Sequence, residues 1–171
     1  VDFSVGENFD FYSYVYPYNA DDREVIWESS DETVATVDNK GTLKFVKSGK
    51  TTIKVKSKTT SHFDEVEITV HPSNEGIEIL GDKEITVNTN QYTLLKAKVM
   101  PEGVLEQELV WTNDAGVDEN DYNIINFYGP GDCWHDDDVL AESYDEMVFS
   151  ATRPGKYTIT VTTEDGKYSD S

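Results

Sequence analysis

The sequence predicts an all-β chain folded as two tandem sandwich domains. Its 171 residues can hold two small domains that each bury a core of their own. Short runs rich in Val, Ile, Thr, Tyr and Phe are separated by turn-forming residues about every eight to twelve positions, and no window shows a sustained helical period of roughly 3.6 residues. A set of motifs in the first half also returns, in order, in the second half, which is typical of a duplicated fold.

The most specific motif surrounds Trp27. An apolar strand ends in this Trp, a polar turn follows, and a second short strand leads to Gly41 and then to Gly49 before a third strand. The motif reads Val25-Ile26-Trp27, Ser29-Ser30-Asp31, Val34-Ala35, Val37-Asp38, Gly41, Gly49 and Thr51-Thr52-Ile53-Lys54-Val55. In this order and spacing it resembles the bacterial immunoglobulin-like domain of group 2, and with Val5-Gly6-Glu7 upstream the resemblance covers residues 1–72. The resemblance implies an immunoglobulin-like β-sandwich but says little about function, because such folds host many roles.

A divergent second copy of the motif follows the first. Trp111 lies 84 residues after Trp27, whereas Gly155 lies 106 residues after Gly49. The second copy therefore carries about 22 extra residues between its Trp strand and its Gly strand. We expect the two Trp side chains to occupy equivalent buried positions.

The boundary between the copies is expected at Pro72, where a proline ends strand pairing and small polar residues follow. The predicted domains are residues 1–72 and 73–171, both immunoglobulin-like sandwiches. The second is expected to carry an acidic insertion at about residues 114–146.

The core of the first domain is predicted from the alternation of apolar and polar residues along its strands. Residues 3–17 alternate as one strand-like segment, and the resemblance places Phe11 and Val15 inward and the intervening tyrosines outward. The predicted core consists of Phe11, Val15, Trp27, Val34, Val37, Leu43, Ile53, Val55 and Ile68.

The charge balance excludes several classes of partner. The formal net charge is −20, with 8 basic and 13 acidic residues in the first domain against 6 and 21 in the second. Nucleic acid and anionic membranes need clustered Lys and Arg, which are missing here. No apolar run approaches the roughly 20 residues that span a bilayer. The single cysteine, Cys133, excludes an internal disulfide.

The acidic insertion is the first candidate site. It holds eleven carboxylates and no Lys or Arg between residues 114 and 146. Calcium takes six to eight oxygen ligands, and the candidate ligands are Asp118, Asp121, Asp132, Asp136, Asp137 and Asp138. The spacing fits no EF-hand loop, so a solvated acidic loop is the favoured interpretation and calcium, the one candidate cofactor, is the alternative.

The run Cys133-Trp134-His135 places a thiol two residues from an imidazole. This pair of groups suggests either a zinc site or a thiol nucleophile. Structural zinc needs four N or S ligands, and a thiol nucleophile needs a positioned base and an oxyanion hole. We favour a packed cysteine and a surface histidine.

A row of tyrosines is the second candidate site. Tyr12, Tyr14, Tyr16 and Tyr18 alternate with other residues along one segment. Rings about 7 Å apart on a strand form an aromatic row suited to sugar faces, peptides or a neighbouring domain, and Trp134 is a further candidate ligand-binding residue. The favoured alternative is structural, with Lys54 and Lys56 of a paired strand covering the rings.

These observations favour a non-enzymatic spacer or adhesion element of a larger bacterial protein, with flanking domains of the same chain and a cell-surface glycan or protein as partners. The chain begins without an initiating Met or signal peptide, so we expect it to be part of a longer protein. The resemblance implies a secreted or cell-surface setting, or a phage virion.

The alternative function is a carbohydrate-binding module attached to a cell-wall or polysaccharide-active enzyme or to a phage virion protein. A third class, a hydrolase using a carboxylate pair in the insertion, needs two acids held roughly 5 to 9.5 Å apart, which spacing along the chain does not provide.

Overall fold

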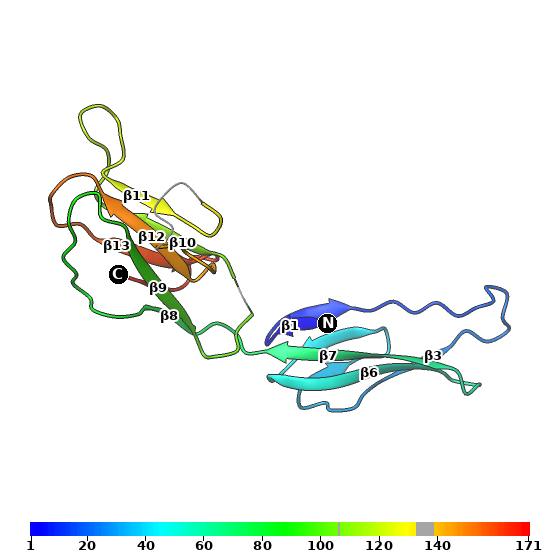
Figure 1. Ribbon diagram of the computed structural model, residues 1–171. Coiled ribbons are helices and arrows are strands. Elements are labelled where there is room, and N and C mark those ends of the chain that lie inside the picture. The colour runs from blue at the N-terminus through cyan, green and yellow to red at the C-terminus, as the bar shows by residue number, and fades with distance from the viewer. Residues whose placement is uncertain (106, 133–138) are drawn as a thin grey trace. The chain divides into compact units, whose positions relative to one another are not determined.

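The computed structural model describes residues 1–105, 107–132 and 139–171, and every regular element among them is a strand (Figure 1). The prediction of an all-β fold is therefore confirmed. The chain divides into two compact units: unit 1 comprises Val1–Ser73 and Pro101–Leu105, and unit 2 comprises Asn74–Met100 and Glu106–Ser171. The described residues include no helix long and apolar enough to cross a membrane.

Unit 1 is built from two sheets. One has the strand order β1-β7-β6-β3 and the other the order β2-β5-β4. The strands are β1 Asp2–Ser4, β2 Asn8–Asp10, β3 Val25–Ser29, β4 Ala35–Val37, β5 Thr42–Phe45, β6 Gly49–Ser57 and β7 Phe63–His71. The hairpin of β6 and β7 is the longest part of the unit (Figure 1), and the strands of the second sheet are much shorter.

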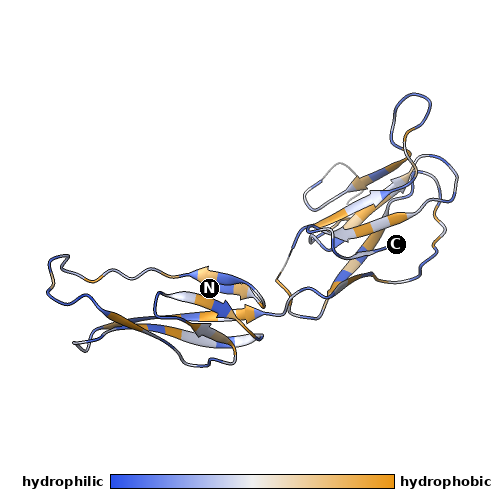
Figure 2. Cartoon of the chain, turned by 180° about the vertical axis from the view of Figure 1, so that it is seen from behind, coloured by the Kyte–Doolittle hydropathy of each residue, from blue (hydrophilic) through white to orange (hydrophobic). Residues whose placement is uncertain are grey.

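The core of unit 1 lies between these sheets. Its buried members are Val34, Ala35, Leu43, Phe45, Ile53, Ile68 and Val70, and Phe3, Val5, Phe11, Trp27, Val37 and Val66 pack against them partly buried. Seven of the nine predicted core residues are in this cluster. Figure 2 shows apolar and polar residues alternating along the strands, as expected for sheets with one buried face.

Two predicted core residues, Val15 and Val55, lie outside the cluster and are only half-buried. Val15 was predicted on a strand running through residues 3–17, but β2 ends at Asp10. Val55 lies on β6 opposite Trp27 of β3, but it stays half-buried. Alternation along a strand reports which face a residue lies on, but not how fully the opposite sheet covers it.

Trp27 packs closely but is not fully enclosed. Its ring is stacked on that of Phe11, with centroids 6.3 Å apart and planes 8° apart. Gly41 has φ +91°, and a Cβ there would lie 3.1 Å from the indole and 2.4 Å from the Phe11 carbonyl oxygen. The turn can approach the indole only with glycine at this position. Trp111 is only 8% exposed, whereas Trp27 is half-buried, so the two predicted buried positions differ in how fully they are enclosed.

Unit 2 also has two sheets, with strand orders β10-β13-β14 and β11-β12-β9-β8. The strands are β8 Gly76–Ile79, β9 Thr93–Met100, β10 Leu109–Asn113, β11 Ile125–Tyr128, β12 Glu146–Ala151, β13 Ile159–Thr163 and β14 Ser169–Asp170. The buried apolar residues between the sheets are Ile77, Ile79, Ala97, Leu109, Trp111, Ile125, Phe149, Ala151 and Val161.

Strand pairing repeats between the units. Trp27 of β3 pairs with Val55 of β6, and Trp111 of β10 pairs with Val161 of β13. The second sheets also correspond, because β5 lies between β2 and β4 as β12 lies between β9 and β11. The prediction of two tandem immunoglobulin-like sandwiches is confirmed.

The extra residues of unit 2 fall on both sides of β11 in the sequence. Ala35 pairs with Phe45 in unit 1, and Ile125 pairs with Ala151 in unit 2. The difference in residue number is 84 between the two tryptophans, 90 between Ala35 and Ile125, and 106 between Phe45 and Ala151. Six extra residues therefore precede β11 and sixteen follow it, so the acidic stretch predicted as one insertion contains a strand of the sandwich.

Candidate functional site

The tyrosine row is exposed, as predicted. The exposed fractions of Tyr12, Tyr14, Tyr16 and Tyr18 are 78%, 77%, 81% and 81%. The row does not lie on a strand, because β2 ends at Asp10 and the next strand, β3, begins at Val25. The exposure is confirmed, while the prediction that the row binds a ligand stays a prediction.

The lysines expected to cover the tyrosine rings have other partners. Lys54 Nζ lies 4.2 Å from the centroid of the Phe63 ring, and Lys54 also pairs with Glu65 at 3.0 Å. Lys56 pairs with Glu28 on β3. In the structure, therefore, Lys54 and Lys56 do not cover the tyrosine rings, and this alternative interpretation is wrong.

Asp118 organises the first loop of the acidic stretch. Its Oδ1 accepts the N–H groups of Asn120 at 2.8 Å and Tyr122 at 3.1 Å, and its Oδ2 accepts from Arg153 Nη2 at 3.0 Å. The Asn120 and Tyr122 amides, with the Arg153 guanidinium, lower the pKa of Asp118. Arg153 also binds Glu119 at 2.6 Å. Both Asp118 oxygens thus hold the loop closed.

The proposed calcium ligands are distributed over two loops. Asp118 and Asp121 lie before β11, and Asp132 lies after it, where its Oδ2 accepts the Gly129 N–H at 2.8 Å. In residues 1–105, 107–132 and 139–171, no group of three His, Cys, Asp or Glu side chains is placed to hold a metal. The remaining candidates, Asp136, Asp137 and Asp138, and also Cys133, Trp134 and His135, lie outside the described residues. Calcium binding stays a prediction.

A shallow hollow beside the first loop was not anticipated from the sequence. Its volume is about 490 Å³, and it is lined by Asp118, Asp121, Tyr122, Asn123, Asn126 and Thr152. Tyr122 is 71% exposed, and Asn126 lies on β11. The hollow combines one aromatic ring with amide, hydroxyl and carboxylate groups, a set that can contact polar ligands. Asp118 and Asp121 were predicted as calcium ligands, and no local sequence pattern marks the other lining residues.

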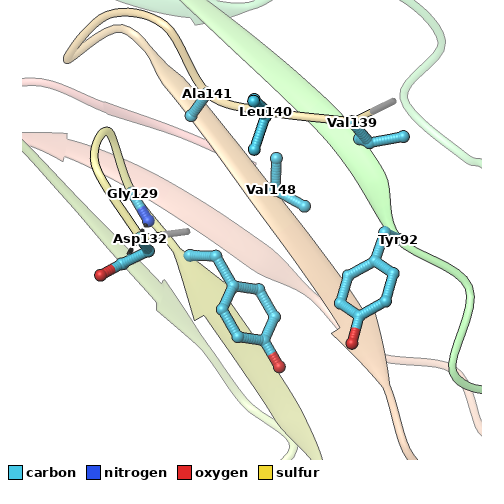
Figure 3. Close-up of a pocket in the computed structure, with 8 residues that line it drawn as sticks. Tyr92, Gly129, Asp132, Val139, Leu140, Ala141 and Val148 are labelled. Atoms are coloured by element: carbon cyan, nitrogen blue, oxygen red, sulfur yellow. Dashed lines mark hydrogen bonds between the residues drawn. The ribbon is translucent and has the colours of Figure 1, made fainter. Parts of the chain in front are cut away.

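The described end of the second loop covers the outer face of unit 2's second sheet. Figure 3 shows Val139, Leu140 and Ala141 on a segment crossing β12, with Val148 beneath and Tyr92 beside it. The cavity between them is about 10 Å³, about the volume that one water needs. This region is a packed contact rather than a ligand site.

The second loop is also anchored by a buried carboxylate. Glu146 is only 7% exposed, pairs with Lys96 of β9, and accepts the Glu142 N–H at 2.7 Å. The hydrogen bond from Lys96 is the main reason that the pKa of Glu146 is lowered. The pairing is structural, because both oxygens have partners within the fold.

His71 joins three parts of unit 1. Its Nε2 lies 3.0 Å from Asp2 Oδ1 and its Nδ1 lies 2.9 Å from the Gly103 carbonyl oxygen. Both partners are acceptors, so the charged imidazolium satisfies both contacts. Asp2 and then Gly103 raise the pKa of His71.

A comparison with known families finds a match within the first unit. Residues 2–70 match the family of bacterial Ig-like domains, group 2. This match confirms the resemblance predicted for the first domain from its Trp and Gly motif.

One curated relative also matches over a short region. It is named 3-O-alpha-D-galactosyl-alpha-L-arabinofuranosidase, from Bifidobacterium longum subsp. longum, and is 43% identical over 72 residues. The match covers 42% of this chain and only 6% of the length of that protein.

Solved structures of a surface-layer protein, SbsC, also align with the chain. SbsC domains 4 and 5 align with a TM-score of 0.40 and 16% identity, covering 82% of this chain and 64% of that one. SbsC domains 1–6 align with a TM-score of 0.39 and 17% identity, covering 82% of this chain and 18% of that one.

Proposed function

We propose that residues 1–171 are a non-catalytic spacer or adhesion module of a larger bacterial protein that works outside the cell or on its surface. The match of residues 2–70 to bacterial Ig-like domains supports the setting. The arabinofuranosidase relative supports the modular character, because the similar segment is 6% of that protein. A module of this kind contributes reach and mechanical continuity rather than chemistry.

The observation that carries the spacer role is the pairing of β1 with β7. These strands run parallel, with Asp2 opposite Thr69 and Ser4 opposite His71. Tension applied through the two ends of such a pair acts along the strands, so its hydrogen bonds are loaded together instead of opening one at a time. The geometry suits a module that transmits force.

The backbone hydrogen bonds of this pair extend slightly beyond the strands. Val5 N–H donates to the His71 carbonyl at 2.9 Å, and Thr69 N–H donates to the Val1 carbonyl at 2.9 Å. The β1 segment is also anchored in the core, because Phe3 stacks on Phe45 with ring centroids 4.3 Å apart. Pulling β1 away therefore breaks hydrogen bonds and exposes apolar surface in the same step.

Single-molecule pulling of residues 1–171 from both ends tests the proposal. The unfolding force of unit 1 should fall in Val5→Pro, because proline removes the N–H that donates to His71. The matched control is Ser13→Pro, in a segment without strand pairing, and its unfolding force should equal that of the unchanged chain. An unchanged force in Val5→Pro, or an equal loss in Ser13→Pro, contradicts the proposal that the β1–β7 pair carries the applied force.

A second candidate function is carbohydrate binding, favoured by the four exposed tyrosines of the row. Aromatic faces of this kind can stack on sugar rings. The test is a glycan array probed with the unchanged chain and with the Tyr12→Thr, Tyr14→Thr, Tyr16→Thr triple variant. Signals lost in the triple variant support a glycan platform; absent or unchanged signals leave the spacer role alone.

A further inference from the structure

Unit 2 carries a small hairpin where unit 1 has a short connection. Residues 30–34 join β3 to β4 in unit 1, whereas residues 114–124 join β10 to β11 in unit 2 and extend beyond the strands (Figure 1). Val117 and Asn123 form an antiparallel bridge, and Asp118 N–H donates to the Tyr122 carbonyl oxygen at 2.8 Å. The extra residues before β11 thus have a defined structure of their own.

Hydrogen bonds fix this hairpin at its tip and at its base. Asp118 accepts two backbone N–H groups of the turn and also binds the Arg153 guanidinium. At the base, the Thr152 N–H donates to the Ile124 carbonyl oxygen at 2.9 Å. A surface that is already ordered before binding avoids much of the entropic cost of ordering it around a ligand.

The hairpin forms one wall of the hollow described above, and β11 contributes part of its floor. Ile125 and Phe127 pack in the core of unit 2, so Asn126 between them lies on the outer face of the sheet. Tyr122 is 71% exposed and belongs to none of the core clusters of the described residues. The volume of about 490 Å³ lies in the range of small-molecule sites, about 300–1,000 Å³.

Several polar groups of the hollow have hydrogen-bonding capacity to spare. Within the part of the chain that the structure describes, the side chains of Asp121, Asn123 and Asn126 have no hydrogen-bond partner. The Thr152 hydroxyl donates to the Ile124 carbonyl oxygen at 3.2 Å, which leaves its oxygen able to accept. Each amide offers both donors and an acceptor, so together these groups can satisfy a ligand that carries several hydroxyls.

The charges around the hollow select against anionic ligands. None of its six lining residues is Lys or Arg. Arg153 compensates Asp118, but Asp121 forms no ion pair with any residue that the structure describes. The net charge of −20 adds to this repulsion. The ligand is therefore a neutral molecule with hydroxyl groups and an apolar face for the Tyr122 ring.

We propose that the hollow is a binding site for a neutral saccharide. The Tyr122 ring packs on the C–H face of a sugar, while Asn123, Asn126 and Thr152 form hydrogen bonds with its hydroxyls. Asp121 accepts from a hydroxyl and disfavours acidic sugars. Asp118 takes no ligand hydroxyl, because both of its oxygens already hold the loop. A shallow site for a single ring has a dissociation constant of roughly millimolar order.

An NMR titration of isotope-labelled residues 1–171 tests the proposal. The probes are D-glucose, D-galactose, D-mannose, D-xylose, L-arabinose and N-acetyl-D-glucosamine, each to roughly 50 mM. At least one of them should shift the side-chain amide signals of Asn123 and Asn126 and the backbone amide of Tyr122 in a saturable way. For a hexose that binds, the corresponding uronic acid should bind about tenfold more weakly at low salt.

Variants assign the binding to the hollow. Tyr122→Ala should weaken it about tenfold, and Asn126→Ala should weaken it several-fold. The matched control is Tyr144→Ala, because Tyr144 is 63% exposed in the same unit but lies outside the hollow, and its affinity should equal that of the unchanged chain. Asp121→Asn should narrow the difference between a hexose and its uronic acid. Thermal melts verify that unit 2 remains folded in each variant.

Four results would overturn the inference: no saturable shift with any of the sugars, equal affinities of Tyr122→Ala and Tyr144→Ala, tighter binding of the uronic acid, or shifts confined to the tyrosine row. Shifts at Tyr122 and Asn126 caused by calcium chloride but by none of the sugars would assign the hollow to a cation and also overturn it. The inference goes beyond the spacer role, because the pulling experiment tests β1 and β7. It is equally independent of the tyrosine row, whose triple variant leaves the hollow intact.

Discussion

Equivalent positions on the outer faces of the two units have opposite character. In unit 1, β5 presents Thr42 and the exposed Lys44 on this face. The equivalent residues of β12 in unit 2 are Val148 and Ser150, only 3% and 4% exposed. The difference lies in the sixteen extra residues between β11 and β12, whose described end covers β12.

The comparison shows how an inserted loop changes the strand beneath it. Val148 and Phe149 are consecutive residues buried on opposite faces of β12. A strand buried on both faces has a continuous apolar run instead of alternation, and Met147-Val148-Phe149 is such a run. The described end of the loop, residues 139–141, therefore forms a third layer over β12, which unit 1 lacks at the equivalent strand β5.

The largest expected effect is a loss of folding stability on replacing either tryptophan, and it should differ between the two units. Trp111→Ala should cost about 3–5 kcal/mol, as large deletions in a core do, because Trp111 is buried. Trp27→Ala should cost roughly half as much, since its ring is half-buried. Urea denaturation with separate probes for each unit measures both values, and equal losses would contradict the difference in burial.

Calcium is expected to act on unit 2 alone. A cation that binds only the folded form, at one hundred times its dissociation constant, stabilises it by about 2.7 kcal/mol. Thermal melts in excess calcium and in chelator, at matched ionic strength, should differ for the unit 2 transition. The triple variant Asp136→Asn, Asp137→Asn, Asp138→Asn should abolish the shift. Superimposable melts of the unchanged chain would exclude calcium.

Exchanging outer-face residues tests the loop as a third layer. Val148→Thr, which copies Thr42, should destabilise unit 2 by about 1–2 kcal/mol because a buried hydroxyl replaces a methyl group. The reciprocal change, Thr42→Val, should alter the stability of unit 1 by about 0.5 kcal/mol or less. Chemical denaturation of both variants provides the measurement. A Val148→Thr effect as small as that of Thr42→Val would mean that the loop does not exclude water.

The smallest expected effect is a pH dependence confined to unit 1. Asp2 raises the pKa of His71 in the folded state, so folding favours the protonated ring. This contribution is fully present below the unfolded pKa of about 6.5 and is lost as the pH rises through the higher folded pKa.

His71→Gln, which keeps a donor but no titratable group, should flatten this part of the pH profile. The measurement is the urea midpoint of unit 1 between about pH 6 and pH 8. A profile with the same slope in His71→Gln would assign the dependence to another group. The unit 2 transition in the same samples is the internal control.

The tyrosine row and the hollow beside Tyr122 illustrate how far a candidate site can be predicted. The exposure of the row follows from alternation with inward residues such as Phe11, which is a local property. Its position off the sheet depends on where the pairing of β2 with β5 ends, and alternation along the chain does not report that position. The hollow joins a loop residue to Asn126 on a strand and Thr152 after another strand, so no local pattern marks it.

The sequence by itself determined the fold class and the strands around Trp27 and Trp111, because turn residues and two-residue alternation act within a few positions of the chain. The tertiary structure decided that β11 divides the acidic stretch and that Val15 and Val55 leave the core. These outcomes depend on which strands meet and how fully the opposite sheet covers each residue, and residues distant in sequence set both.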